Sequence, residues 1–190
     1  MTLSNKITLF RVSLCPIFLA LFLIPGVLYK ILALLIVIFS ETSDALDGYL
    51  ARKRNQLTML GKLFDPYADS IFRYTTFLCF TGYIHGGHNI VPVWMVVLIF
   101  YRDATIWFLR TISASQDFIL SARISGKLKA IFQAITILLI MLLIILTEFG
   151  LNVYLNNIAY YAMLMVTLFT LISGVEYLIA NWKLIKSVKR

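Results

Sequence analysis

The chain reads Asp44-Ala-Leu-Asp47-Gly48-Tyr-Leu-Ala51-Arg52 and, eight residues later, Gly61-Lys-Leu-Phe-Asp65-Pro-Tyr-Ala-Asp69, which sets four aspartates in two strongly apolar stretches. An ionisable side chain in an apolar membrane segment is costly, so by default it marks a functional site. On helices the first two aspartates are i,i+3 neighbours and the last two are i,i+4 neighbours, so each pair shares one face. A hairpin between the two helices would bring the pairs opposite each other.

The composition around these aspartates is that of an integral membrane protein. Of the 190 residues 61% are hydrophobic, and the mean hydropathy is +0.88. A soluble domain is much more polar. The net charge of +8 is therefore attributed to topology and to anionic lipid headgroups rather than to nucleic-acid binding. We expect a single domain over residues 1–190.

Six apolar segments predict an all-α membrane protein with six transmembrane helices. The segments span residues 7–25, 30–50, 60–83, 91–112, 128–149 and 155–182, and each is long enough to cross about 30 Å of hydrocarbon. Residues 1–11 hold Lys6 and Arg11 among apolar side chains, which predicts a short interfacial amphipathic helix that precedes and runs into the first span, or else the frayed start of that span. His85-Gly-Gly-His88-Asn is the clearest turn signal.

The basic residues predict the orientation of these spans. They gather at both termini and in the second and fourth connections, whereas the alternate loops carry only Lys30. By the positive-inside rule both termini and the aspartates face the cytoplasm. We expect a multi-pass protein of a bacterial-type inner or cell membrane.

Four carboxylates at low dielectric cannot all stay ionised unless cations hold them. Two carboxylate pairs on facing helices could hold two divalent ions, and ligands that are all oxygen favour Mg²⁺ or Mn²⁺. Such a metal pair is a common arrangement for phosphoryl transfer. Membrane acids also serve ion or proton translocation, and this alternative stays open. Because the aspartates cluster near one face on two adjacent helices, metal–phosphate chemistry is the favoured hypothesis.

Small residues and one arginine accompany the acids. Gly48, Ala51 and Gly61 leave the backbone beside the metals uncovered, so a nucleotide could approach closely. Arg52 follows on the same side, where its guanidinium could bind a phosphate. Glu41, one turn before Asp44, either supports the acids or faces the space between helices.

The two quoted stretches fit the signature of the CDP-alcohol phosphatidyltransferases, D-x2-D-G-x2-A-R-x8-G-x3-D-x3-D, at every specified position. The chain therefore resembles this family over nearly its whole length. The resemblance implies transfer of a phosphatidyl-type group from a CDP-linked lipid to a small polar alcohol, with release of CMP, by a homodimer. It further implies roles for individual residues: Asp44, Asp47, Asp65 and Asp69 as metal ligands, Asp69 also as the catalytic base, and Gly48, Ala51, Arg52 and Gly61 in the CDP site.

Other stretches resemble the phosphatidylglycerophosphate synthase subfamily. They are Asn5-Lys-Ile-Thr8-Leu-Phe-Arg11-Val-Ser-Leu-Cys-Pro16, residues 51–66 and Ser125-Gly126-Lys127-Leu128-Lys129. The resemblance adds Thr8 to the CDP site and implies CDP-diacylglycerol as donor and sn-glycerol 3-phosphate, a dianion, as acceptor. Cations should then line the acceptor site, and the candidates are Arg73, Arg102, Arg110, Lys127 and Lys129.

Two positions depart from the subfamily pattern. Ser70 stands where the subfamily usually has Lys, and Arg73, one turn later, is the candidate for the missing cation. Arg102-Asp103 stands where an Arg-Glu pair is usual. As helix neighbours these two point about 100° apart, so we expect Arg102 to serve the site rather than to pair with Asp103. Inositol phosphate, inositol and choline remain alternative acceptors.

Overall fold

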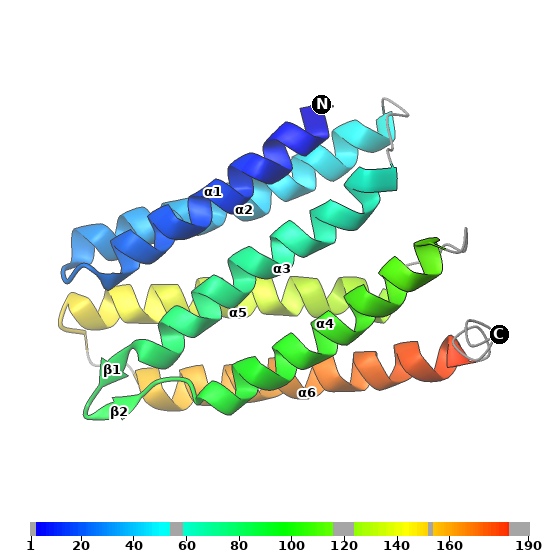
Figure 1. Cartoon of the computed structure of the whole chain (residues 1–190). Helices are drawn as coiled ribbons and strands as arrows, with labels where there is room; N and C mark the ends of the chain where they lie inside the picture. The colour runs from blue at the N-terminus through cyan, green and yellow to red at the C-terminus, as the bar shows by residue number, and fades with distance from the viewer. Residues whose placement is uncertain (1–2, 54–58, 116–123, 152–153, 183–190) are drawn as a thin grey trace.

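The computed structural model describes residues 3–53, 59–115, 124–151 and 154–182. Within these ranges the side chains of residues 3–9, 44–53, 59–66 and 114–115 are not described. The described residues form six helices and one short hairpin (Figure 1). These elements are α1 (Leu3–Leu23), α2 (Val27–Lys53), α3 (Met59–Gly82), β1 (Ile84–His85), β2 (His88–Asn89), α4 (Val93–Ser115), α5 (Ile124–Glu148) and α6 (Leu155–Ala180).

The helices alternate in direction and form one elongated bundle (Figure 1). The start of α1, the end of α2, the start of α3, the end of α4, the start of α5 and the end of α6 lie at one end. The α1–α2 turn, the hairpin, the end of α5 and the start of α6 lie at the other. The described helix ends that adjoin most of the basic residues of the sequence thus share one end.

Buried apolar side chains from α1 and α3 form much of the core. Phe18 and Phe22 stack on each other with ring centroids 5.8 Å apart, and Phe18 lies 5.7 Å from Phe72. Phe22 in turn lies 6.0 Å from Phe80. These rings recur at helical spacing, so each helix presents a continuous apolar face to the other. This packing fixes α3, which carries Asp69, against α1.

The first helix fits the interpretation in which the amphipathic start runs into the first span. Among the described residues α1 is continuous from Leu3 to Leu23 and passes through Pro16. Residues 1–11 hold no helix-breaking residue, and a proline inside a helix removes only one backbone hydrogen bond. The amphipathic start is therefore the first part of α1.

Lys30, the one basic residue of the alternate loops, folds inward. It is 4% exposed, and its ammonium donates to the backbone carbonyls of Phe22 and, at 3.2 Å, Ile24. It also lies 4.6 Å from the centroid of the Phe22 ring. Lys30 thus satisfies carbonyls at the end of α1, which a helix leaves unpaired.

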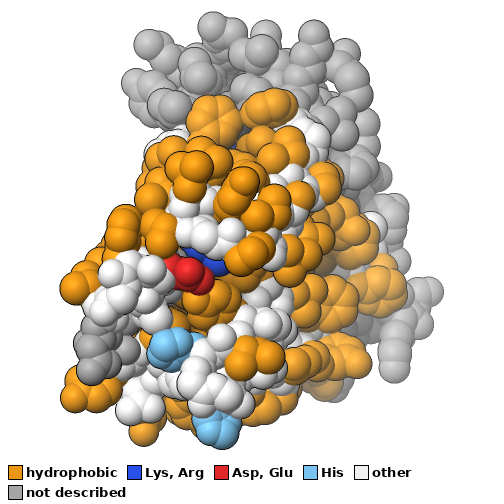
Figure 2. Space-filling model, turned by 90° about the vertical axis from the view of Figure 1, so that its left-hand side faces the viewer, with side chains coloured by type: hydrophobic (Ala, Val, Ile, Leu, Met, Phe, Trp, Pro, Cys, Tyr) orange, Lys and Arg blue, Asp and Glu red, His pale blue; other side chains and the backbone are white. Residues whose placement is uncertain are grey.

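The predicted turn at residues 85–89 is confirmed as a two-residue hairpin. His85 pairs with His88, and Gly86 and Gly87 between them have φ of 60° and 82°. A two-residue turn with positive φ at both central positions matches the twist of the flanking strands, and glycine adopts it without strain. Figure 2 looks onto this end, where hydrophobic side chains cover most of the described surface and charged ones show only as a small patch.

The outward faces of the helices are strongly apolar. Leu28, Leu35, Met165, Ile172 and Ile179 are each more than half exposed. An apolar surface of this kind is typical of contact with lipid. Among the described residues, α5 and α6 are long and apolar enough to cross a membrane, and α1 holds a shorter apolar stretch, Phe10–Leu23. The all-helical fold is confirmed, whereas six membrane crossings stay a prediction.

Candidate active site

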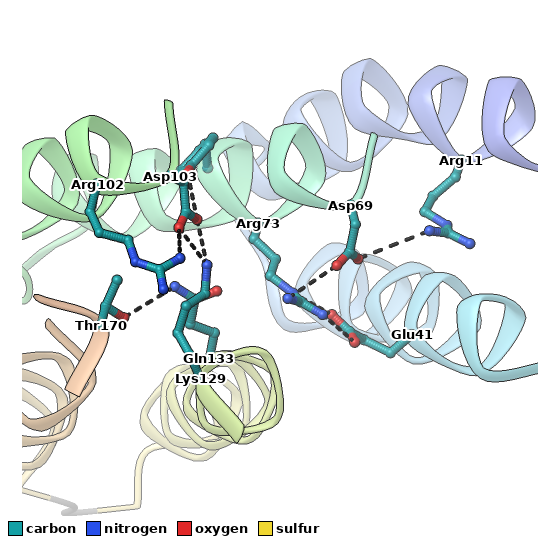
Figure 3. A network of polar contacts seen from close by, with 10 residues as sticks. Arg11, Glu41, Asp69, Arg73, Arg102, Asp103, Lys129, Gln133 and Thr170 are labelled. Atoms are coloured by element: carbon teal, nitrogen blue, oxygen red, sulfur yellow. Dashed lines mark hydrogen bonds and ion pairs between the residues drawn. The ribbon is translucent and has the colours of Figure 1, made fainter. Parts of the chain in front are cut away.

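Asp69 on α3 lies between two arginines (Figure 3). Its Oδ2 is 3.1 Å from Nη1 of Arg73, and its Oδ1 is 4.0 Å from Nη1 of Arg11 on α1. Both arginines are buried, whereas the Asp69 side chain remains 20% exposed. The carboxylate is therefore accessible in a strongly cationic environment.

Arg73 also contacts α2. Its Nε and Nη2 donate to the two carboxylate oxygens of Glu41, at 3.3 and 3.2 Å. This pair joins α2 to α3 beside the aspartate motif (Figure 3). Of the two interpretations of Glu41, the structure favours support of the acids.

The Glu41–Arg73 contact sets the register of the motif aspartates. The two helices run in opposite directions (Figure 1), so moving one turn forward on α2 corresponds to moving one turn back on α3. Asp44 and Asp47 follow Glu41 on α2, and Asp65 and Asp69 precede Arg73 on α3, so both pairs lie in the same direction along the bundle from this contact. That the four carboxylates form one site stays a prediction.

Most of the predicted metal and CDP-binding side chains lie outside the described part of the structure. These are the side chains of Thr8, Asp44, Asp47, Ala51, Arg52 and Asp65; Gly48 and Gly61 are placed only through the backbones of α2 and α3. Their roles stay predictions.

A second network surrounds Asp103 on α4. The Tyr74 hydroxyl of α3 donates to its Oδ2 at 2.7 Å, and Lys129 Nζ of α5 contacts both of its oxygens at 2.6 Å. Nη1 of Arg102 donates to Oδ1 at 2.8 Å. The expectation that Arg102 and Asp103 do not pair is therefore wrong. Their Cα–Cβ vectors diverge, but the arginine side chain is long enough to fold back onto its neighbour.

Arg102 is held from the other side by α6. Its Nη2 donates to Oγ of Ser173 at 2.7 Å, and a Cβ on Gly174 would lie only 2.7 Å from its Cγ. The absence of a side chain at Gly174 thus allows Arg102 to lie against the α6 backbone. The arginine side chain is 10% exposed, and its Nε is buried without a hydrogen-bond partner.

Both networks open onto one cavity of about 460 Å³. All five predicted acceptor-binding cations line it, together with Asp69 and Asp103: Arg73, Arg102, Arg110, Lys127 and Lys129. Tyr67 of α3 and Trp107 of α4, whose ring centroids are 5.2 Å apart, add an aromatic wall. Residues from four helices, α3 to α6, therefore converge here.

Two of the five cations have no carboxylate partner among the described residues. The guanidinium of Arg110 lies 5.4 Å from the ring centroid of Tyr177 and donates to its hydroxyl at 3.4 Å. Lys127 is exposed at the start of α5. Both groups are available to an anion in the cavity, whereas Lys129 and Arg102 already share the carboxylate of Asp103.

Comparison with known proteins identifies the family. Residues 1–179 match the family model for CDP-alcohol phosphatidyltransferase. The chain belongs to this family. It is 31% identical to the CDP-diacylglycerol--glycerol-3-phosphate 3-phosphatidyltransferase of Bacillus subtilis (strain 168), over 97% of both chains.

Of two further relatives, one has the same name as the Bacillus protein and the other has a different name. The protein of Aquifex aeolicus (strain VF5) with the same name is 28% identical over 97% of this phosphatidyltransferase and 98% of its own length. A cardiolipin synthase (CMP-forming) of Streptomyces coelicolor is 36% identical over 55% of this chain and 47% of its own.

The residues present fit the divalent metal that the family signature implies. The signature supplies four carboxylates and no sulfur or imidazole ligand, a set that suits hard cations such as Mg²⁺ and Mn²⁺. Asp69, whose side chain is described, faces the cavity and already attracts two guanidinium groups. The metal itself stays a prediction.

Sequence reasoning did not assign a role to several residues that shape the cavity. Asp103, Ser173, Gly174 and Tyr177 lie far from the signature in the chain, and Tyr74 lies on α3 beyond its last aspartate. Asp103 carried a usable signal, since a carboxylate in a membrane segment marks a site. The other four are ordinary residues of membrane helices, and only the packing of α3, α4 and α6 reveals them.

Proposed function

We propose that this phosphatidyltransferase transfers a phosphatidyl group from CDP-diacylglycerol to sn-glycerol 3-phosphate, with release of CMP. The observation that carries the proposal is the charge of the cavity beside Asp69. Among the side chains that the structure describes, five cations and two carboxylates line it. This surplus of positive charge suits a phosphorylated acceptor better than inositol or choline. The names of the Bacillus and Aquifex relatives support the same acceptor.

In this reaction the acceptor hydroxyl attacks the phosphorus that carries diacylglycerol. A new P–O bond forms to the acceptor oxygen, the P–O bond to CMP breaks, and CMP leaves with the bonding electrons. Asp69, at the mouth of the acceptor cavity, takes the hydroxyl proton. Arg110 and Lys127 bind the acceptor phosphate, and Asp103 holds Arg102 and Lys129 in place.

Two Mg²⁺ or Mn²⁺ ions, held by Asp44, Asp47, Asp65 and Asp69, would neutralise the pyrophosphate and stabilise the charge that develops on the leaving group. Gly48, Ala51, Arg52, Gly61 and Thr8 would surround the CDP moiety. The fit of the carboxylate set to hard cations supports this assignment.

We further propose that all six helices span the membrane, that both termini and the active site face the cytoplasm, and that the protein is a homodimer. The described helix ends that adjoin the basic stretches of the sequence share one end of the bundle, which supports the orientation (Figure 1). The apolar outward faces support contact with lipid. The dimer rests on the family resemblance alone.

CMP release by the purified protein tests the proposal. CDP-diacylglycerol and Mn²⁺ are supplied with one acceptor at a time: glycerol 3-phosphate, inositol phosphate, inositol, choline or phosphatidylglycerol. We expect release with glycerol 3-phosphate, its loss on chelation of the metal, and its loss in Asp69→Asn. Release with phosphatidylglycerol instead would favour the activity in the name of the Streptomyces relative. Metal-independent release would contradict the proposed metal ions but not the transfer reaction. No release with any acceptor would contradict the proposed reaction and leave ion-coupled transport as the alternative.

A further inference from the structure

Arg73 is shared between carboxylates on two helices. Glu41 of α2 accepts from its Nε and Nη2, and Asp69 of α3 lies against its Nη1 (Figure 3). The guanidinium is buried, with Arg73 6% exposed. All three of its nitrogens therefore contact carboxylates: within the described part of the chain, Nε and Nη2 face Glu41 and Nη1 faces Asp69.

A different contact between Arg73 and Asp69 is within reach. The two residues are i,i+4 neighbours on α3, so their side chains lie on the same face. A guanidinium pairs most strongly with a carboxylate through two parallel hydrogen bonds, and burial reduces screening of the pair by solvent. Without a partner on α2, Arg73 would turn toward Asp69 and occupy both of its oxygens.

We propose that Glu41 is a positioning residue that keeps Asp69 available to divalent cations. By holding the Nε–Nη2 edge of Arg73, it restricts the guanidinium to a single contact with Asp69. The inference rests on the proposed function, since it takes Asp69 as a metal ligand. Glu41 lies outside the signature. In this proposal it controls how strongly Arg73 competes with the metal for the carboxylate of Asp69.

Mn²⁺ binding to the purified full-length protein, measured by titration calorimetry without lipid or nucleotide, tests the inference. Glu41→Gln replaces one accepting oxygen with an NH₂ group and frees an edge of Arg73. We expect the dissociation constant for Mn²⁺ to rise by about 3- to 10-fold. In an Arg73→Gln background the same Glu41→Gln change should leave the dissociation constant unaltered, because no guanidinium remains to compete.

Two control variants separate positioning from charge. Glu41→Asp keeps the charge but shortens the reach, so it should also weaken Mn²⁺ binding. Glu176→Gln removes an exposed carboxylate of α6 and should leave binding unchanged. Thermal unfolding measured without metal establishes that each variant is folded. If Glu41→Gln does not fold, Glu41→Asp replaces it in the Mn²⁺ titrations.

Equal weakening by Glu41→Gln in both backgrounds would overturn the inference, because it would reflect lost negative charge only. Absence of Mn²⁺ binding by the unaltered protein would overturn it as well. The outcome is independent of turnover: a protein that shows the expected Mn²⁺ cycle but releases no CMP would contradict the proposed function and leave the role of Glu41 intact.

Discussion

At the scale of single residues, the two lysines at the start of α5 have different surroundings although only one residue separates them. Lys129 is 7% exposed and contacts both oxygens of Asp103, whereas Lys127 is exposed and has no carboxylate partner among the described residues. The sequence predicts an acceptor-binding role for both. The structure separates them into a lysine that holds the site together and a lysine that remains available to the substrate.

Replacement of Lys127 by alanine should therefore raise the apparent KM for the acceptor more than the apparent KM for CDP-diacylglycerol. A lost charged hydrogen bond to phosphate corresponds to about 1.5–3 kcal/mol, or roughly 10- to 100-fold. Thermal stability should not change, because the side chain is exposed. Steady-state kinetics with each substrate varied in turn gives both constants, and an equal effect on the two would contradict the assignment.

Lys129→Ala is the matched comparison. Removing one partner of a buried ion pair leaves a carboxylate incompletely compensated and destabilises a protein by about 3–5 kcal/mol. We expect a value near the lower limit, because Arg102 and Tyr74 still contact Asp103. Denaturation in detergent measures the loss, and a variant as stable as the parent would show that the Asp103 network does not contribute to folding.

At the scale of helices, the site depends on how closely α4 and α6 approach. Arg102 of α4 lies over Gly174 of α6, where an added Cβ would come within 2.7 Å of Cγ and 3.1 Å of Nε. Gly174→Ala should push the guanidinium away from Ser173, destabilise the fold by about 1–3 kcal/mol and raise the acceptor KM. Gly82→Ala is the control, since an added Cβ there meets nothing within 4 Å. The test compares the free energy of unfolding and the acceptor KM of the two variants. Equal values for Gly174→Ala and Gly82→Ala would contradict the prediction.

The helices themselves could be predicted, because hydrophobic runs and charged connections fix where a membrane helix begins and ends. The ends of α2, predicted at 30–50 and observed at Val27–Lys53, differ by three residues each. Pairing between side chains could not be predicted in this way. Glu41 meets Arg73 across 32 positions, and Asp103 meets Lys129 across 26. Such pairs depend on the rotation and crossing of packed helices, which spacing within one helix does not determine.

At the scale of the whole molecule, the two ends of the bundle differ in charge and shape. The cavity lies toward the end where the described helices adjoin the basic stretches of the sequence, and the other end carries the hairpin and an apolar surface (Figures 1 and 2). Lys30 stands near the start of α2, at the hairpin end of the bundle. Its side chain is buried and donates to carbonyls at the end of α1. It therefore adds little positive charge to that surface, and the charge difference between the ends is larger than a count of residues suggests.

This asymmetry predicts that the hairpin faces away from the cytoplasm. A cysteine introduced at His88, which is exposed, should react with a membrane-impermeant maleimide in right-side-out vesicles, whereas one at Lys127 should react only in inverted vesicles. The native thiols of Cys15 and Cys79 are buried and should contribute little labelling, and their replacement by alanine removes the remainder. Labelling of position 88 only in inverted vesicles would reverse the proposed orientation and place the acceptor cavity on the outer side. Labelling of both positions from the same side would instead contradict the set of six crossings, because an odd number of spans separates them in the proposed topology.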